Sequence, residues 1–321
     1  MSIKLALAGD TMLGRGVAQS LLRAPPGTLF SSAVAEAIRE ADLFVLNLEC
    51  CISERGAPWP DPSKPFFFRA PPSAVDALAH LGVDCVTLAN NHALDFGETA
   101  LSDTLGYLEE AGIRTVGAGP HVVAARAPAI LVRDGFRLAV LGVTDHPSDY
   151  AAGPTRAGVA FADLRRGPSP WLGEAIRSAR VRADAVLVTP HWGPNMTTEP
   201  VPHVSAAARY LVEAGATLVA GHSAHVFHGV SDRVLFDIGD FLDDYLTDPV
   251  LRNDLGLLFL VTLDGSHLVR LEAVPLKLDF CHTRLAGGED GAWVRRRFRE
   301  ACGSLGTEVT EEGGRLVVSM R

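Results

Sequence analysis

The sequence is short of cysteine, of positive charge and of long apolar runs, and each shortage argues against a class of protein. Its five cysteines include no Cys-x-x-Cys pair, which argues against a disulfide framework or a zinc knuckle and is typical of reduced cytosolic proteins. The net charge of -9 gives no support for binding nucleic acid or an anionic membrane surface. The lack of a Gly-x-x-x-x-Gly-Lys-Ser/Thr loop ranks ligase-like and transferase roles last.

The N-terminal segment also lacks the features of a targeting signal. Its first apolar run spans only Leu5 to Ala8 before Gly9-Asp10 interrupts it, which is too short for the core of a signal peptide. No window of the chain approaches the roughly 18 apolar residues that a membrane helix needs. The sequence therefore predicts a cytoplasmic protein without a membrane anchor.

Short apolar runs rich in Val, Leu and Ile recur along the chain and predict buried strands. They lie at 3–9, 43–49, 83–89, 137–143, 183–189, 216–221 and 233–239. Both faces of each run are apolar, as in strands that are covered on both sides. Amphipathic stretches of helical length separate several of them, and Asp-Gly pairs at 134–135 and 264–265 indicate two hairpins. This alternation predicts an α/β fold in which helices cover mixed sheets.

Polar side chains occur where these predicted strands end. In chain order they are Asp10, Asn47, Glu49, Asn90, Asn91, His92, His191, Asn195, His222, His225 and Asp240. Because the loops that leave the carboxyl ends of strands converge on one crevice, we expect these side chains to lie together. Imidazole, carboxylate and amide oxygen are ligands that suit Zn, Mn or Fe. Each residue alone has an ordinary structural explanation, so the predicted metal site depends on their joint occurrence.

Three further residues are predicted to contact a substrate. Arg15 lies in the loop that follows the first strand, and Arg69 ends the long Pro-rich loop at 55–72. A guanidinium group near a metal would bind a phosphate or a carboxylate through two hydrogen bonds, whereas a surface salt bridge is the alternative for both arginines. Asn195, in the segment His-Trp-Gly-Pro-Asn, is the third. Asp243 and Asp244, behind Asp240, are expected to face solvent.

Six motifs occur in an order that resembles a known family. They are GDTMLGR, NLE, LANNHALDFG, HWGPN, GHSAH and GDF, and together they resemble the CapA family of poly-γ-glutamate (capsule) biosynthesis proteins over residues 3 to about 275. That family is similar to the calcineurin-like metallophosphoesterases. The resemblance implies their four-layer α/β/β/α sandwich with mixed sheets, in a single domain over 1–321. The core would span about 3–275, and 276–321 would form a C-terminal helix and strand extension.

The resemblance also implies roles for individual residues. The metal ligands that it implies, for one or two divalent ions of Mn, Fe or Zn, are Asp10, Glu49, Asn91, His191 and His222. His92 matches the catalytic imidazole that protonates the leaving group or stabilises the transition state. Asn47, Asn90 and Asp240 would support the ligands from behind.

Two positions depart from the wider superfamily. Met12 stands where the Asp-x-His motif has its histidine, so one ligand of that motif is absent. The last motif, Gly-His-Ser-Ala-His, is one residue longer than Gly-His-x-His. His225 therefore either reaches the metal by a different path or acts on the substrate as a catalytic residue. Asp240 is a candidate to replace the missing ligand.

The implied function is that of a metal-dependent hydrolase. A metal-bound hydroxide would attack a phosphoester or a γ-glutamyl amide in a small anionic or γ-glutamyl-containing substrate. The alternative is a non-catalytic accessory protein of poly-γ-glutamate or capsule synthesis that binds the polymer or a synthase partner. The missing Asp-x-His histidine favours the accessory role, whereas retention of the other ligand types favours the hydrolase. The metal content of the purified protein discriminates between them.

Overall fold

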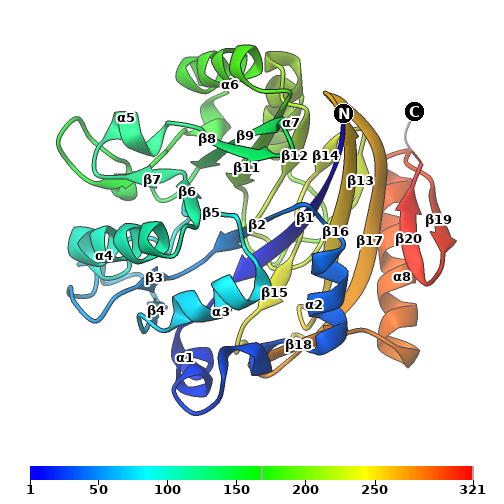
Figure 1. Cartoon of the computed structure of the whole chain (residues 1–321), viewed down its shortest axis with the longest axis horizontal. Coiled ribbons are helices and arrows are strands. Elements are labelled where there is room, and N and C mark those ends of the chain that lie inside the picture. The colour runs from blue at the N-terminus through cyan, green and yellow to red at the C-terminus, as the bar shows by residue number, and fades with distance from the viewer. Residues whose placement is uncertain (168, 320–321) are drawn as a thin grey trace.

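Two mixed β-sheets face each other at the centre of the molecule, and helices cover their outer faces (Figure 1). The computed structural model describes residues 1–167 and 169–319. This is the predicted α/β/β/α sandwich of four layers with mixed sheets, and the fold class is confirmed.

The larger sheet has ten strands, and its N-terminal strand lies at the centre. In spatial order it runs β19 (Val309–Glu312), β20 (Arg315–Val318), β17 (His267–Asp279), β16 (Leu255–Asp264), β1 (Ser2–Thr11), β2 (Leu43–Leu48), β5 (Cys85–Thr87) and β6 (Arg114–Val116). Off this path, β15 (Asp240–Leu242) pairs with β1 and β18 (His282–Leu285) pairs with β17. Strands β2, β5, β6 and β15 run parallel to β1, whereas β16 runs antiparallel to it.

The smaller sheet has six strands. Their order is β13 (Val230–Ser231), β14 (Val234–Leu235), β12 (Leu218–Ala220), β11 (Ala185–His191), β9 (Phe136–Thr144) and β8 (Ala129–Arg133). Two short pairs lie outside the main sheets, namely β3 (Cys51–Ile52) with β4 (Arg69–Ala70), and β7 (Ala118–Gly119) with β10 (Gly158–Val159). Both predicted Asp-Gly hairpins are confirmed, since they join β8 to β9 and β16 to β17.

Most of the described helices pack on the outer faces of the two sheets. Those that pack on the larger sheet are α1 (Arg15–Leu21), α2 (Ser32–Arg39), α3 (Ala74–Leu81) and α4 (Gly97–Glu110). Those on the smaller sheet are α6 (Pro170–Arg182) and α7 (Pro202–Ala214), and α5 (Val122–Ala125) is a single turn. Short 3-10 helices span Pro26–Leu29, Ser148–Tyr150 and Leu164–Arg166. Among the described helices, none combines the length and the apolar character that crossing a bilayer demands.

Local sequence explains where several helices begin and end. The Ser31 hydroxyl accepts a hydrogen bond from the Val34 N–H at the start of α2. Helices α3 and α7 end at Gly82 and Gly215, whose φ values of 75° and 115° lie in the left-handed region that glycine adopts without strain. These are the C-terminal glycines that close the amphipathic stretches of the sequence.

Alternate residues of each central strand pack into different cores. Ala6 of β1 packs under the helices of the larger sheet, whereas Leu7 faces the smaller sheet. Likewise, Val188 of β11 lies under α6 and α7, and Leu187 faces the inter-sheet core. Since every such strand is covered on both sides, its sequence is apolar at consecutive positions. Helix α8 (Gly288–Ser304) closes one end of the inter-sheet core through Phe298 and its neighbours.

A small ion-pair cluster joins the C-terminal hairpin to the N-terminal half of the chain. Arg315 of β20 is ion-paired with Glu40, which follows α2, and the Lys4 Nζ of β1 donates to the same carboxylate at 3.1 Å. The hydrogen bond from Arg315, helped by that from Lys4, lowers the pKa of Glu40 to about 2. The pair is partly exposed, so its contribution to stability is modest.

Replacing Glu40 by Gln should therefore lower the free energy of unfolding by about 0.5–1 kcal/mol at pH 7. A carboxylate whose pKa is lowered on folding stabilises the protein above its unfolded pKa, near 4.5, and loses this effect as the pH falls toward 2. Urea unfolding should thus show a smaller difference at pH 3 than at pH 7. Glu36→Gln, on the exposed face of α2, is the control and should leave the free energy of unfolding unchanged at both pH values. An equal loss at both pH values would rule out the ion pair as its cause.

Candidate metal centre

The predicted polar residues of the two sheets meet at one edge of the sandwich. Asp10, near the end of β1, is in register with Asn47 of β2 and with Asp240 of β15. His191 is the last residue of β11 and forms an isolated β-bridge with His222. The larger sheet thus supplies the carboxylates and the smaller sheet supplies the histidines.

A first group of potential ligands combines Asp10, Glu49 and His191. One ligand atom from each residue lies within 4.8 Å of the others. The Glu49 Oε1 is 3.5 Å from the His191 Nε2, and the Asp10 Oδ1 is 3.3 Å from the His222 Nδ1. All four side chains are buried. These distances leave room for an ion between oxygen and nitrogen atoms that do not hydrogen bond well with each other.

A second group contains Asp10, His225 and Asp240, whose ligand atoms also lie within 4.8 Å of one another. The His225 Nδ1 is 2.8 Å from the Asp240 Oδ1 and 3.4 Å from the Asp10 Oδ2. Asp10 belongs to both groups and would contribute a carboxylate oxygen to each. Met12 stands at the position where the Asp-x-His motif has its histidine, and it offers no such ligand. Asp240, which is in register with Asp10, offers a carboxylate at this end of β1 instead.

The longer final motif reaches Asp10 through an unusual backbone. Ser223 and His225 have φ values of 111° and 59°, a region that non-glycine residues seldom adopt. The Ser223 N–H points to the Asp10 Oδ2 at 3.4 Å, and the Ser223 hydroxyl donates to the Gly193 carbonyl at 3.1 Å. The extra residue is thus accommodated by a tight local turn that brings the His225 ring back to the cluster.

The cluster contains many buried polar atoms that lack a hydrogen-bond partner among the described residues. They are both carboxylate oxygens of Glu49, both ring nitrogens of His191, the Nδ1 of His222, the Oδ1 of Asn91 and the Oδ2 of Asp240. Buried polar atoms are normally satisfied, so such a concentration requires an explanation. Carboxylate, imidazole and amide oxygen form a donor set that transition metals take. The residues therefore fit one or two divalent ions.

The pKa shifts in the cluster follow from burial and crowding. Burial, reinforced by the charge of Asp10, raises the pKa of Glu49 well above its usual range. Burial, with the like charges of Asp243 and Asp10, does the same to the pKa of Asp240. Burial lowers the pKa of His191, which keeps the imidazole neutral, the form that binds metals. Crowded carboxylates beside neutral imidazoles favour the uptake of cations.

Asp10 differs from these acids because histidines surround it. Burial opposes its ionisation, but the His222 imidazole, whose Nδ1 is 3.3 Å away, and the charges of His225 and His191 hold the pKa of Asp10 well below its usual range. The Asn47 Nδ2 donates to the Asp10 Oδ1 at 2.7 Å. Asp10 is thus an ionised carboxylate with a fixed orientation.

Asn47 and Asn90, which were expected to support the ligands, are hydrogen-bonded to each other and link the ends of two strands. The Asn90 Nδ2 donates to the Asn47 Oδ1 at 2.9 Å and to the Leu48 carbonyl at 2.8 Å. The Asn90 Oδ1 accepts from the His92 N–H at 3.0 Å. The end of β5 is thereby tied to the end of β2, and the backbone of His92 is held in place.

His92 lies beside this cluster and is oriented by Asp95, a residue that the sequence reasoning missed. Its Nδ1 is 2.6 Å from the Asp95 Oδ2, its ring stacks on Phe68 with centroids 4.0 Å apart, and its Nε2 is 3.9 Å from the Glu49 Oε1. Burial lowers the pKa of His92, and Asp95 opposes that effect. The position of Asp95, three residues after His92 in the motif LANNHALDFG, was the available signal.

Asp95 is itself held by residues from distant loops. The Lys64 Nζ lies 2.9 Å from the Asp95 Oδ1 and also donates to the Asn91 carbonyl at 2.8 Å. The Tyr150 hydroxyl donates to the Asp95 Oδ1 at 3.2 Å, and the Phe68 N–H donates to the Oδ2 at 2.6 Å. Lys64 and Tyr150 carry no local sequence signal, because only the packing of the loops brings them to His92.

A pocket of about 300 Å³ opens beside His92 and His225. We call it the Arg15 pocket, and its lining includes Arg15, Phe66, Phe68, His92, Asn195, His225 and Tyr245. The Arg15 guanidinium lies 5.3 Å from the centroid of the Phe68 ring and 5.6 Å from that of the Tyr245 ring. The structure thus brings two of the three predicted substrate contacts, Arg15 and Asn195, to the wall of one pocket.

Asp244 fixes Arg15 in this pocket, which corrects the expectation that Asp243 and Asp244 face solvent. Both aspartates are buried. The Asp244 carboxylate lies 2.6 Å from the Arg15 Nη2 and accepts from the Gly16 N–H at 2.8 Å. Asp243 accepts from the Tyr245 N–H at 2.8 Å, and burial raises the pKa of Asp243 to about 6. The chain folds back after β15 and so covers residues that the polar sequence DDY suggests are exposed.

The structure does not bring Arg69 to the Arg15 pocket. The Arg69 guanidinium stacks on the Phe96 ring, 4.1 Å from its centroid, and Arg69 is not among the residues that line the pocket. Phe68, the residue before β4, lines the pocket, whereas Arg69 packs on Phe96 outside it. The predicted contact between Arg69 and the substrate therefore has no support in this geometry.

Comparisons with known proteins agree with the motifs. The chain is 28% identical to a "probable polyglutamine synthesis accessory protein" of Mycobacterium tuberculosis, across 98% of this chain and 95% of the relative. It is 27% identical to the "capsule biosynthesis protein CapA" of Bacillus anthracis, across 75% of this chain and 60% of that protein. The "PGA biosynthesis protein CapA" of Bacillus subtilis is also 27% identical, over 75% of this chain and 63% of the relative.

Among solved structures, a hypothetical protein from Thermus thermophilus superposes with a TM-score of 0.49 and 14% identity, over 86% of this chain and 99% of that chain. The model of a bacterial capsule synthesis family, PGA_cap, matches residues 4–245. That match covers most of the chain and every motif named above, from GDTMLGR to GDF. The chain therefore belongs to the PGA_cap family of bacterial capsule synthesis proteins, which confirms the resemblance to CapA.

Proposed function

We propose that the chain is a metal-dependent hydrolase whose site holds one or two divalent transition-metal ions. The observation that carries the proposal is the concentration of buried, unpartnered ligand atoms on Glu49, His191, His222, Asn91 and Asp240. A purely structural cluster would pair these atoms with each other, because an unmet buried polar atom costs about 1–3 kcal/mol. An ion is the partner that satisfies carboxylate oxygens and imidazole nitrogens together.

The ligand atoms divide between two positions. Asp10, Glu49 and His191 would hold one ion, with His222 and Asn91 completing the ligands, and Asp10, His225 and Asp240 would hold the other. Such ions, when bound, polarise a substrate oxygen and lower the pKa of a coordinated water. The distances from His225 to Asp10 and Asp240 favour a ligand role for this histidine over a direct role on the substrate.

Other residues would bind the substrate and move a proton. His92 lines the Arg15 pocket with its Nδ1 engaged by Asp95, so its Nε2 is the nitrogen available to protonate a leaving group. Arg15 and Asn195 would hold an anionic group of the substrate in the same pocket. The aromatic side chains of Phe66 and Phe68 would keep water from this part of the site.

Two substrate classes fit this arrangement. The ligand set favours a phosphoester, since phosphoryl oxygens bind well between two cations. The names of the relatives, which refer to polyglutamine and PGA, favour a γ-glutamyl amide. Both classes present an anionic group that Arg15 could hold.

A non-catalytic accessory role is the second candidate. It is favoured by the relative from Mycobacterium tuberculosis, which is named a probable accessory protein and whose alignment covers 98% of this chain. Met12 in place of a ligand histidine points the same way. In this case the chain would bind polymer or a synthase partner without cleaving a bond.

Elemental analysis separates the two candidates. The purified protein, exposed to Mn, Fe and Zn and then dialysed, should retain one or two equivalents of metal, whereas a His191→Ala, His222→Ala double variant should retain almost none. A His80→Ala, His267→Ala double variant is the matched control, because both of these histidines are exposed and lie outside the cluster. It should bind metal like the wild type.

The metal-loaded protein is then assayed with bis(p-nitrophenyl) phosphate and with γ-L-glutamyl-p-nitroanilide. Turnover of either compound that disappears in the His191, His222 variant identifies the bond class. Wild-type protein that stays free of metal refutes the hydrolase. Protein that holds metal but cleaves neither compound nor a γ-glutamyl peptide favours the accessory role.

A further inference from the structure

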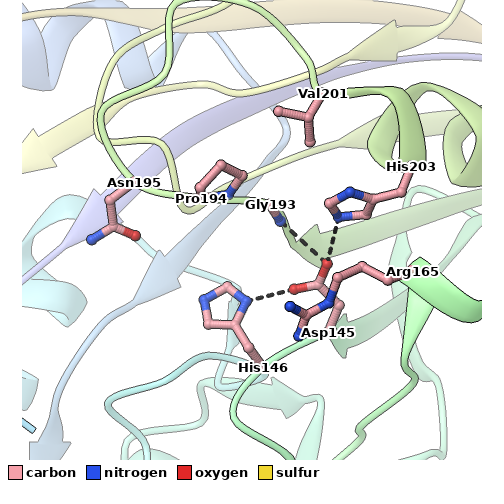
Figure 2. Close-up of a pocket in the computed structure, with 8 residues that line it drawn as sticks. All are labelled: Asp145, His146, Arg165, Gly193, Pro194, Asn195, Val201 and His203. Atoms are coloured by element: carbon pink, nitrogen blue, oxygen red, sulfur yellow. Dashed lines mark hydrogen bonds and ion pairs between the residues drawn. The ribbon is translucent and has the colours of Figure 1, made fainter. Parts of the chain in front are cut away.

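A second pocket, of about 440 Å³, adjoins the metal cluster, since the ring of His146 in its lining is 5.1 Å from that of His191. We call it the Asp145 pocket, and its polar walls are Asp145, His146, Arg165, Asn195 and His203 (Figure 2). Its volume lies in the range of about 300–1,000 Å³ that is usual for pockets that bind small organic ligands. The residues of this pocket play no part in the hydrolase proposed above, apart from Asn195.

A series of close side-chain approaches links the two pockets through residues of the metal cluster. On one side, the Nε2 of His92, which lines the Arg15 pocket, is 3.9 Å from the Glu49 Oε1. Glu49 in turn lies 3.5 Å from His191. On the other side, the His191 ring is 5.1 Å from the ring of His146, which lines the Asp145 pocket. Asn195 lines both pockets, so the two pockets adjoin at this residue.

The buried Asp145 carboxylate holds the wall of the second pocket in place through hydrogen bonds. Its side chain is 2% exposed, and three donors hold it, as the dashed lines in Figure 2 show. Its Oδ1 lies 2.5 Å from the His146 Nδ1, and its Oδ2 lies 3.1 Å from the His203 Nε2 and 3.3 Å from the Gly193 N–H. These contacts fix both imidazole rings on the wall and occupy both oxygens of the carboxylate.

The groups that remain available in the pocket are hydrogen-bond donors. Arg165 makes one ion pair among the described residues, between its Nε and the Asp163 Oδ1 at 3.7 Å, so the terminal nitrogens of its guanidinium are uncommitted. The Asn195 side chain has no hydrogen-bond partner within the described part of the chain, and it stands apart from the Asp145 carboxylate (Figure 2). Since the Asp145 carboxylate is already satisfied, the uncommitted Arg165 fork suits an oxyanion, such as a carboxylate or a phosphate.

We propose that the Asp145 pocket is a second substrate subsite, in which Arg165 binds an anionic group of a substrate whose neighbouring anionic residue lies in the Arg15 pocket. This inference rests on the proposed function, because it assumes that the substrate crosses the metal cluster. It narrows the substrate to an oligomeric anion with at least two charged residues, one on each side of the bond that reacts. A substrate with a single anionic group would fill only one pocket.

Binding measurements on the full-length, metal-loaded protein test the subsite without relying on turnover. Isothermal titration calorimetry with tri-γ-L-glutamate and with L-glutamate measures how much more tightly the longer ligand binds. Mass spectrometry checks that the trimer stays intact. Arg165→Ala should weaken binding of the trimer by about 10- to 100-fold, the usual effect of a lost charge-assisted hydrogen bond, and leave L-glutamate within twofold of wild type. The same comparison of affinities between glycerol 1,3-bisphosphate and glycerol 3-phosphate tests whether the anionic group that Arg165 binds is a phosphate.

Arg166→Ala is the matched control. Arg166 is the next residue, 88% exposed, and pairs with the same Asp163 at 3.0 Å, but it does not line the pocket. It should leave binding of both glutamate ligands unchanged. An Arg165-dependent gain for the bisphosphate alone supports the subsite with phosphate as its ligand.

Three outcomes overturn the subsite. In the first, the wild type binds the trimer no more tightly than L-glutamate, and binds the bisphosphate no more tightly than the monophosphate. In the second, Arg165→Ala has wild-type affinity for every ligand. In the third, Arg166→Ala loses as much affinity as Arg165→Ala. Failure of the proposed function looks different, because it is seen as absent metal in the elemental analysis. A metal-containing protein that cleaves a small chromogenic compound but shows no effect of Arg165 therefore refutes the subsite alone.

Discussion

Replacing Glu49 by Gln is expected to make the metal-free protein more stable and the metal-loaded protein less stable than the wild type. Glu49 is completely buried, and neither of its carboxylate oxygens has a hydrogen-bond partner among the described residues. Burial and the nearby negative charges of Asp10 and Asp240 raise its pKa well above its usual range. In the absence of an ion, this carboxyl group opposes folding at neutral pH.

The pH dependence of the metal-free proteins follows from the direction of this shift. An acid whose pKa is raised on folding loses stability as the pH rises above its unfolded value, here near 4.5, because the unfolded chain ionises first. Glu49→Gln removes that loss, so the metal-free variant should gain about 1–3 kcal/mol at pH 7. The difference between variant and wild type should disappear as the pH is lowered toward 4.5.

Metal binding reverses the order of stability. An ion that binds only the folded state adds about 4 kcal/mol when its concentration is a thousand times its dissociation constant. Gln offers a neutral oxygen in place of a carboxylate, so the variant should lose most of this increment. Urea unfolding at pH 7 with EDTA and then with excess MnCl₂ measures both halves of the prediction.

Glu272→Gln provides the comparison. Glu272 is also buried, but it has cationic partners in Arg270, Lys4 and Arg315. Its replacement should destabilise the protein to a similar extent with and without metal, since it is remote from the cluster. If Glu49→Gln instead destabilises the metal-free protein, the carboxylate has a structural partner and the metal-site explanation loses its main support.

The sequence identifies the candidate ligands that gather at one sheet edge better than it identifies the residues that hold them. Asp10, Glu49 and His191 stand at or just after the ends of apolar runs, and parallel strands bring such ends to one edge of a sheet whatever the loops do. The two covered faces of β1 and β11 likewise follow from consecutive apolar residues. Both predictions depend only on local pattern and on the geometry of sheets.

The residues that escaped prediction depend on the packing of loops. Lys64 and Tyr150 reach Asp95 from distant segments, and nothing near them in sequence marks that destination. Arg69 does not reach the pocket because its guanidinium packs on the ring of Phe96, a contact that only the tertiary fold creates. The residues around Asp145 were not predicted either, because they come from segments far apart in the sequence. His203, for example, reaches Asp145 from α7.

His92→Gln should lower kcat by about 10²- to 10⁴-fold while the metal content and KM stay near their wild-type values. The His92 ring is held by Asp95 and Phe68 with its Nε2 in the Arg15 pocket, so its loss removes a positioned proton donor and no metal ligand. The loss should be large for a poor leaving group, such as an alkoxide or an amine. It should be small for p-nitrophenolate, which leaves without protonation.

The dependence on the leaving group separates proton donation from a structural role. His267→Gln, a change at an exposed position in the β16–β17 hairpin, controls for loss of an imidazole and should leave kcat unchanged for both classes of compound. Equal losses for good and poor leaving groups would assign His92 to substrate positioning, because a proton donor must matter most where the departing group is most basic. Loss of metal from His92→Gln would instead make His92 a ligand, and Glu49, 3.9 Å away, would then share an ion with it.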